Sequence, residues 1–278
     1  MEIDLGNECV VELQAAFTQS QIRDRALIRR VEAFGQVARF IQRAKPEDID
    51  ISVVQKRYKV FWLAVGTSRY VYDRRHTYQV EVAPEVQQVT IYDNKHDVVR
   101  DRTGVFELEA VEHCVEESRA ELTLDPMRGQ ETDYRKYLTF PRTDVADLAA
   151  LEAAGSEVEA PEIRSSFVVR KIISQLMKTF QADNILEEKI FIEEVTLCCR
   201  PVYAVEYNWK SKNKKMVEEF DALTGEINSE GGQIRQGVRR VLKNDALFDI
   251  GADTIGMVMP GANIAIKLGR FAASKAVR

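Results

Sequence analysis

The chain has 278 residues, of which 45% are hydrophobic and 30% are charged, and its formal net charge at pH 7 is −5. This composition is typical of a folded globular protein and excludes a largely disordered or membrane-embedded chain. The negative charge argues against general affinity for nucleic acid, so we expect no nucleic-acid partner.

The first hundred residues predict a helix followed by antiparallel strands, which we assign to an N-terminal unit of residues 1–100. Asp24 to Ala44 carries apolar residues at helical spacing, from Leu27 to Ile41. Strand-like stretches follow at Tyr58 to Val65 and Tyr78 to Val82, and Val86 to Tyr92 follows a bend at Ala83–Pro84.

Three further units follow along the chain. Residues 101–146 predict a middle β-hairpin, Phe106 to Leu124, that turns near Glu117–Ser118. Residues 147–166 are small and acidic and are broken by Gly155 and Pro161, so they predict a linker, or a short helix followed by a linker. Residues 167–230 predict a second helix-plus-hairpin unit. Its helix is Phe167 to Phe180, with Ser165 or Ser166 as N-cap, and its strands are Lys189 to Leu197, Val202 to Trp209 and Met216 to Phe220.

The same short pattern closes two of the predicted hairpins. Asp125 is followed by Gly129, and Asp221 is followed by Gly225, each four residues on. An aspartate at the end of a strand accepts hydrogen bonds from the backbone just beyond it, and a following glycine adopts positive φ without steric conflict. We therefore interpret D-x-x-x-G as a turn that performs no reaction.

A helix, then a hairpin, then D-A-L-T-G-E resembles the PepSY-type repeat, most clearly from Phe167 to Ile227 and more faintly from Asp24 to Tyr92. The resemblance implies small α/β modules of a kind associated with restraining peptidases or binding other proteins. It also implies a secreted or membrane-attached protein, whereas the acidic start MEIDLGNECV lacks a signal peptide and predicts a cytoplasmic one. The predicted fold class is α+β: helix-plus-antiparallel-hairpin modules repeated along the chain, with a helical, glycine-rich C-terminal segment.

Groups with catalytic or metal-binding potential are sparse. The cysteines are Cys9, Cys114 and the adjacent pair Cys198–Cys199, which we expect to be reduced and, for the pair, to point to opposite strand faces. His113–Cys114 could share a metal or a catalytic site with Cys198 or Cys199 only if their hairpins pack together. Because no cofactor fingerprint or catalytic motif occurs, we expect no catalytic residue, no cofactor and no metal, with an unrecognised enzyme as an alternative.

The C-terminal segment, residues 231–278, differs from the rest because it is basic and rich in glycine. It predicts helices at Ile234 to Leu242 and Asn263 to Ala276. It could pack on the protein's own sheet, mediate self-association or partner binding, or lie on an anionic membrane surface.

The leading functional prediction is a non-enzymatic cytoplasmic protein-binding or scaffold protein that binds another protein, through an exposed sheet edge or through the C-terminal segment, or binds itself. The alternative is peripheral membrane association through the C-terminal segment. The candidate partner-binding residues are Tyr203, Tyr207, Trp209, Lys267 and Arg270, although the three aromatic residues also fit a core.

Overall fold

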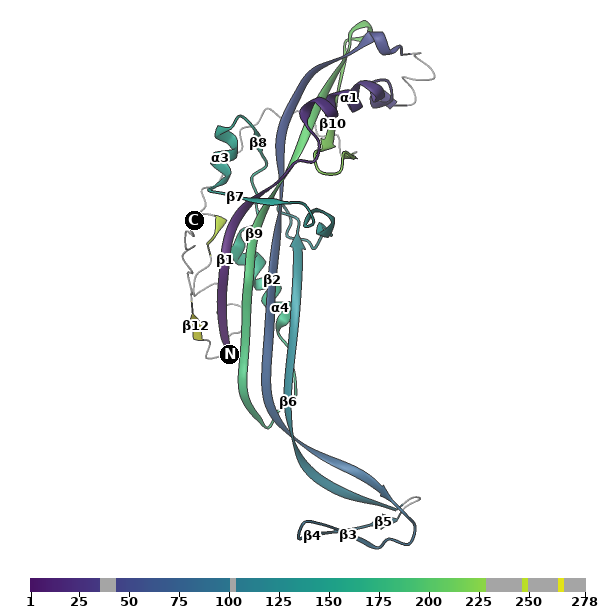
Figure 1. The fold of residues 1–278 in the computed structure, drawn as a ribbon, viewed down its shortest axis with the longest axis vertical. Coiled ribbons are helices and arrows are strands. Elements are labelled where there is room, and N and C mark those ends of the chain that lie inside the picture. Colours follow the sequence, from purple (N-terminus) through teal and green to yellow (C-terminus); the bar gives the residue numbers. More distant parts are fainter. Residues whose placement is uncertain (36–43, 101–103, 229–246, 250–264, 268–278) are drawn as a thin grey trace, which may run out of the picture.

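The computed structural model describes residues 1–35, 44–100, 104–228, 247–249 and 265–267. These residues form an elongated protein built around one long, twisted sheet (Figure 1). Helix α1 and strand β10 lie at one end of the long axis, and a narrow two-stranded ribbon projects at the other (Figure 1). Within the described residues no helix is long and apolar enough to cross a membrane.

Three very long strands form the centre of the sheet, in the order β9-β2-β6. They are β2 (Ile49–Val82), β6 (Gly104–Leu124) and β9 (Asn184–Trp209). Strand β2 pairs antiparallel with both neighbours, whereas β1 (Glu2–Leu13) pairs parallel with β9, so the sheet is mixed. The shorter strands are β3 (Gln88–Ile91), β4 (Asn94–Asp97), β5 (Val99–Arg100), β7 (Arg142–Val145), β8 (Glu157–Val158), β10 (Lys214–Asp221), β11 (Ile227–Asn228) and β12 (Ala265–Lys267).

The predicted fold class is wrong, because strands dominate and no helix-plus-hairpin module repeats in the part of the chain that the structure describes. The predicted middle hairpin is one continuous strand, with Glu117 and Ser118 paired to Arg69 and Ser68 inside the β2–β6 ladder. Polar residues there indicated a turn. Glu117 is on the side of the strand that is open to solvent, and Ser118, on the other side, shares a hydrogen bond with Ser68 at 2.7 Å, so neither polar residue needs a chain reversal.

The two main helices cover different stretches of the sheet. Helix α1 (Gln19–Arg29) packs beside Tyr203, Tyr207 and Trp209, while α4 (Ser165–Leu176) packs on β2, β6 and β9 farther along. The β9–β10 hairpin is therefore covered by the helix from the N-terminus and not by the helix that precedes it in sequence. The predicted module, in which a helix packs on the hairpin that follows it in sequence, is therefore not formed.

The helix predicted at Asp24 to Ala44 begins earlier and ends sooner. Thr18 is its N-cap, and the Thr18 side chain and Gln21 bond each other's backbone N–H in a capping box. After Arg29 the chain tightens into a 3-10 turn at Glu32–Phe34, which packs Phe34 against Trp209. Residues 36–43 of the predicted helix lie outside the described residues.

Pro201 lies inside β9, although proline lacks the N–H that a central strand needs. On one side of β9, pairing with β1 ends at Cys199 and pairing with β10 begins at Val202. The carbonyl of Pro201 accepts a bond from Ala222 N–H on that side, at 3.0 Å. The N–H and C=O of one strand residue point the same way, so the N–H that Pro201 lacks would have pointed to this same side. It would have met the junction between β1 and β10, so its absence removes no ladder hydrogen bond.

Residues 147–166 are not a free linker. Asp147 caps α3 (Leu148–Ala153) through Ala150 N–H, which confirms the short helix of the second alternative. The linker expected after it is wrong, because β8 pairs parallel with Arg57 and Tyr58 of β2. Leu148, Leu151 and Val158 are buried in the same core as α4. This segment therefore belongs to the body of the protein.

Most of the C-terminal segment, including the helix predicted at Ile234 to Leu242, lies outside the described residues. Ala265–Lys267 is a strand paired parallel with Glu2–Asp4, which contradicts the predicted helix at that point. Leu247 is fully buried against the α4 core, and Phe248 contacts Trp62 edge-to-face. Leu247 and Phe248 thus pack against the protein's own core, and the backbone of Ala265–Lys267 adds a strand beside β1.

Candidate functional site

The three aromatic candidates lie in the core. Tyr203, Tyr207 and Trp209 are 7%, 0% and 1% exposed, and with Val205 they form the predicted apolar face of β9 beneath α1. Their burial gives them a packing role in this conformation. The backbone of Lys267 lies in β12, and the side chains of Lys267 and Arg270 fall outside the described residues.

Both D-x-x-x-G patterns are turns, which confirms the prediction from sequence. Asp125 Oδ1 accepts the N–H groups of Met127 and Arg128 at 2.9 and 2.7 Å, and Gly129 has φ +67°. Asp221 Oδ1 accepts the N–H groups of Leu223 and Thr224 at 2.8 and 3.2 Å, and Gly225 has φ +72°. Each carboxylate is thus held by the backbone of its own turn.

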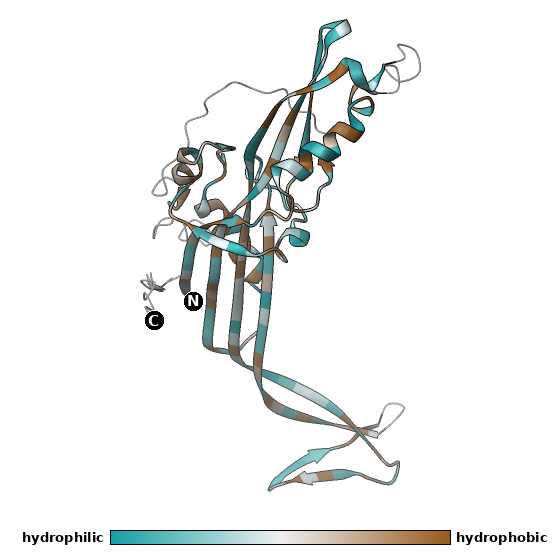
Figure 2. Cartoon of the chain, turned by 45° about the horizontal axis from the view of Figure 1, so that its top comes forward, coloured by the Kyte–Doolittle hydropathy of each residue, from teal (hydrophilic) through white to brown (hydrophobic). Residues whose placement is uncertain are grey.

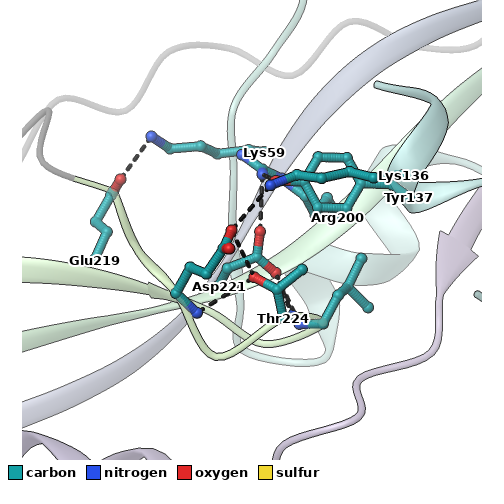
Figure 3. Close-up of polar contacts among 9 residues, drawn as sticks. Lys59, Lys136, Tyr137, Arg200, Glu219, Asp221 and Thr224 are labelled. Atoms are coloured by element: carbon teal, nitrogen blue, oxygen red, sulfur yellow. Dashed lines mark hydrogen bonds and ion pairs between the residues drawn. The ribbon is translucent and has the colours of Figure 1, made fainter. Parts of the chain in front are cut away.

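Asp221 also belongs to a buried group of charged residues (Figure 3). Its Oδ2 lies 2.9 Å from Arg200 Nη1, and the Arg200 guanidinium stacks over the Tyr137 ring and donates to the Tyr137 hydroxyl. Burial raises the pKa of the Tyr137 phenol, and the positive charge of Arg200 opposes that rise. The phenol therefore stays protonated at neutral pH.

Further ion pairs surround this group. Glu219, which is also buried, lies 2.6 Å from Lys59 Nζ, and Lys136 donates to Glu226 at 2.9 Å on the surface side (Figure 3). The paired charges fasten the β10 turn to β9 and to the segment around Tyr137. This arrangement of mutually neutralised groups is typical of a structural ion-pair network rather than a reacting site.

The histidine and cysteine candidates do not come together. Cys114 lies opposite Tyr72 on β2, whereas Cys198 lies opposite Phe61. A strand rises about 3.3 Å per residue, so the two positions are separated by roughly 35 Å. Cys198 and Cys199 are fully buried on opposite faces, as predicted, and the described residues contain no group of His, Cys, Asp and Glu that could hold a metal. The condition for a shared site, that these residues pack together, is therefore not met.

A shallow hollow lies on the sheet face away from α4, lined by polar residues of β2 and β6 together with Lys189 and Phe191 of β9. Its cations already have partners. Arg69 pairs with Glu117, Arg119 Nη1 lies 2.7 Å from Glu193, and Lys189 Nζ lies 3.2 Å from Glu187. The hollow thus offers no unpaired positive charge to an anionic ligand.

The sequence predicted an exposed sheet edge without indicating which strand forms it, and the structure places it at the outer side of β6. Thr123 C=O accepts Thr132 N–H at 3.1 Å, and Asp125 N–H donates to Gln130 C=O, so odd-numbered residues direct their backbone groups away from β2 at this end. The β2–β6 register runs without a bulge from Leu124 to Gly104. Alternate residues from Glu107 to Glu121 therefore point N–H and C=O groups outward.

We call this stretch, Glu107–Glu121, the β6 edge. Among the described residues, β6 pairs on its outer side only at Gly104–Val105, with β5, and at Leu124, with Glu131. Between these points the outward backbone groups have no described protein partner. A row of this kind is a template for another strand.

Part of the β6 edge lies on the projecting ribbon, which we call the arm (Arg74–Val82 with Gly104–Glu112). Strand β9 ends at Asn184, opposite Asp73, so the arm has two strands and extends roughly 30 Å past β9. Hydrophobic and hydrophilic residues interleave along it (Figure 2), and Tyr78 and Val111 are 42% and 53% exposed. Two-stranded ribbons are marginally stable alone in water.

The two sides of β6 differ in charge. On the side shared with α4, Glu112 accepts Arg74 Nε at 2.6 Å and Glu116 accepts Tyr72 and Lys178 at 2.7 and 3.0 Å. Two hydrogen bonds lower the pKa of Glu116, and the one from Tyr72 has a larger effect than the one from Lys178. The opposite, open side carries the exposed side chains, which are Glu107, Glu109, Val111, His113, Val115, Glu117, Arg119 and Glu121.

Comparison with protein-family models, with curated proteins and with solved structures gave no match. The likeness to PepSY-type repeats stays a prediction that rests on the turn at Asp221.

Proposed function

We propose that this protein is a non-enzymatic, cytoplasmic binding protein that takes an extended segment of another protein as an added strand on the β6 edge. The single observation that carries the proposal is the outward row of backbone N–H and C=O groups from Glu107 to Glu121, which has no partner among the described residues. Strand addition gives affinity through main-chain hydrogen bonds and specificity through alternate side chains.

The geometry of β6 supports this function because the strand is ordered before a partner arrives. All of β6 is paired with β2, and as far as Asp73 the strand β2 is backed in turn by β9. A template held in its binding conformation loses little conformational entropy on association. On the arm, a third strand would also support a ribbon that is marginal alone.

Two further observations support the proposal, one for the cytoplasmic location and one for the binding role. The four cysteines are free thiols, which is their usual state in a reducing compartment. The PepSY-type turn at Asp221 resembles a family associated with binding other proteins, so this resemblance supports the binding role and not the location.

The experiment uses proline to remove one outward N–H. Val115 directs its N–H away from β2, so Val115→Pro leaves the β2–β6 hydrogen bonds intact and blocks an added strand at this point. Val115→Ala is the matched control because it changes the side chain and keeps the N–H. We expect Val115→Ala to recover the same partner from native cells as the unchanged protein, and Val115→Pro to lose it at unchanged melting temperature. Equal recovery with both variants would contradict the proposal.

A further inference from the structure

We propose that the strand added to the β6 edge comes from a different protein and carries lysine or arginine at alternate positions, facing the open side of the sheet. This inference rests on the proposed function, and it concerns the chemistry of the partner. The binding site is the set of outward N–H and C=O groups of the β6 edge, and the charged side chains beside them indicate which kind of segment binds there.

The open side of the β6 edge is acidic. Its charged side chains include Glu107, Glu109, Glu117 and Glu121 and one arginine, Arg119. Glu117 is already paired with Arg69 of β2 and Arg119 with Glu193 of β9, so the other three glutamates carry the excess negative charge. Glu107 and Glu109 form no ion pair or hydrogen bond with other described residues, and their neighbours across the ladder, Gln79 and Thr77, are uncharged. An added strand would place every second side chain beside this row, at the distance over which cross-strand charge pairs interact.

On the side of β6 that α4 covers, the glutamates already have partners, so the added strand needs no charged residue there. Arg74 and Tyr78 already contact Glu112, and Lys178 and Tyr72 already contact Glu116. The other residues on this side are small or apolar, such as Ala110 before Glu112 and Cys114 between the two glutamates. The expected segment therefore alternates basic residues with small or apolar ones.

Charge also disfavours a second copy of this chain at the same edge. Two β6 edges carry the same excess of glutamate, so pairing them places like charges across the ladder, which is destabilising. The charges that keep copies of the protein apart are those that favour a basic segment.

The test measures binding of three fluorescent nine-residue peptides to the full-length protein. In each peptide threonine alternates with one other residue, which is lysine in the first peptide, glutamine in the second and glutamate in the third. We expect the lysine peptide to bind most tightly and the glutamate peptide least, with the preference shrinking as salt is raised. In Glu107→Gln/Glu109→Gln, affinity for the lysine peptide should fall by about threefold to tenfold, the size expected for two exposed ion pairs.

The control variant Glu47→Gln/Glu152→Gln removes the same charge at two exposed positions away from β6, and it should keep the affinity.

The possible outcomes distinguish this inference from the proposed function. If all three peptides bind equally and Val115→Pro abolishes binding of all three, the proposed function stands and the basic preference is overturned. Lysine-peptide binding that survives Val115→Pro would show attraction without strand addition and would overturn both. If no peptide binds, the basic segment is wrong, and the recovery of native partners by Val115→Ala and Val115→Pro still decides the proposed function. Self-association in sedimentation that Val115→Pro abolishes would assign the edge to a second copy and overturn the inference.

Discussion

Arg200 and Asp221 form an ion pair inside the protein, with Arg200 Nη1 2.9 Å from Asp221 Oδ2 and side chains only 9% and 1% exposed. The aspartate that shapes the β10 turn therefore also neutralises a buried guanidinium. Asp125 shapes an equivalent turn, but its carboxylate accepts backbone N–H groups of that turn and is half-buried.

This difference predicts unequal effects of the same substitution. Asp221→Ala should lower the free energy of unfolding by about 3–5 kcal/mol, because it leaves Arg200 buried without its partner. Asp125→Ala should lower it by about 1–2 kcal/mol through loss of the turn's hydrogen bonds. Urea unfolding measures both values. The double variant Arg200→Met/Asp221→Asn should recover part of the first loss, and equal losses for the two single variants would refute this account.

Glu218 should make the protein less stable as pH rises. Burial raises the pKa of Glu218, although the hydrogen bond from the Tyr207 hydroxyl opposes the rise. The folded protein therefore holds this proton more tightly than the unfolded chain, and stability is lost as pH increases from the unfolded pKa through the folded one. Glu218→Gln should raise the melting temperature at pH 7 and flatten its pH dependence.

Glu226 provides the control of opposite sign. Lys136 and Thr224 lower the pKa of Glu226, so its contribution is present above the unfolded pKa and is lost as pH falls through the folded one. Glu226→Gln should slightly reduce stability at pH 7 and leave it unchanged at low pH. Thermal unfolding between pH 3 and pH 8 tests both variants. An increase at pH 7 for Glu226→Gln together with a decrease for Glu218→Gln would reverse the prediction.

The cysteines should differ in reactivity. Cys198 and Cys199 are fully buried and burial raises the pKa of both thiols, whereas Cys114 is partly exposed. Iodoacetamide should therefore label Cys114 in the folded protein and reach the buried pair only after unfolding. Peptide mass spectrometry with and without urea measures this order. Labelling of Cys198 at the rate of Cys114 in the folded protein would contradict the described packing.

Leu247 tests whether the start of the C-terminal segment is part of the core. Its side chain is fully buried against the α4 core, so Leu247→Ala should lower the free energy of unfolding by about 2–5 kcal/mol. Ile28→Ala, at a residue 84% exposed, is the matched control and should change stability by less than about 0.5 kcal/mol. Equal changes in the free energy of urea unfolding for the two variants would contradict the packing of Leu247 in the core.

Asp249, two residues on, should act as a helix cap from outside the helix. Its Oδ1 accepts Ser166 N–H at 3.1 Å in the first turn of α4, where Arg164 supplies no capping side chain. Asp249→Ala should therefore lower stability by about 1 kcal/mol. Asp249→Asn keeps the acceptor and should restore most of it. Equal stability of both variants in urea unfolding would contradict a capping role.

Local features were predictable from sequence because local chemistry determines them. The turns at Asp125 and Asp221, the bend after Val82 and the apolar face from Tyr203 to Trp209 depend on neighbouring residues and on strand alternation. The opposite faces of Cys198 and Cys199 follow from the same alternation.

Features that depend on distant pairing were not predictable in this way. The chain reversal expected at Glu117–Ser118 is absent because β2 supplies a partner along the whole of β6. The two strands predicted at Lys189 to Leu197 and Val202 to Trp209 are one strand, β9, because Pro201 lies where pairing with β1 ends and pairing with β10 begins. Likewise, which helix covers the β9–β10 hairpin is decided by packing between segments far apart in sequence. The β6 edge is visible only once each strand's neighbours are known.

Residue-resolved hydrogen exchange of the full-length protein by NMR tests the central claim most directly. If the β6 edge is unpaired, the N–H groups of odd-numbered residues from Glu107 to Glu121 exchange rapidly, while those of the even-numbered residues between them are protected by β2. Adding the lysine peptide should then slow the odd-numbered set alone. Equal protection of both sets in the free protein would show that the edge is already paired and would contradict the account.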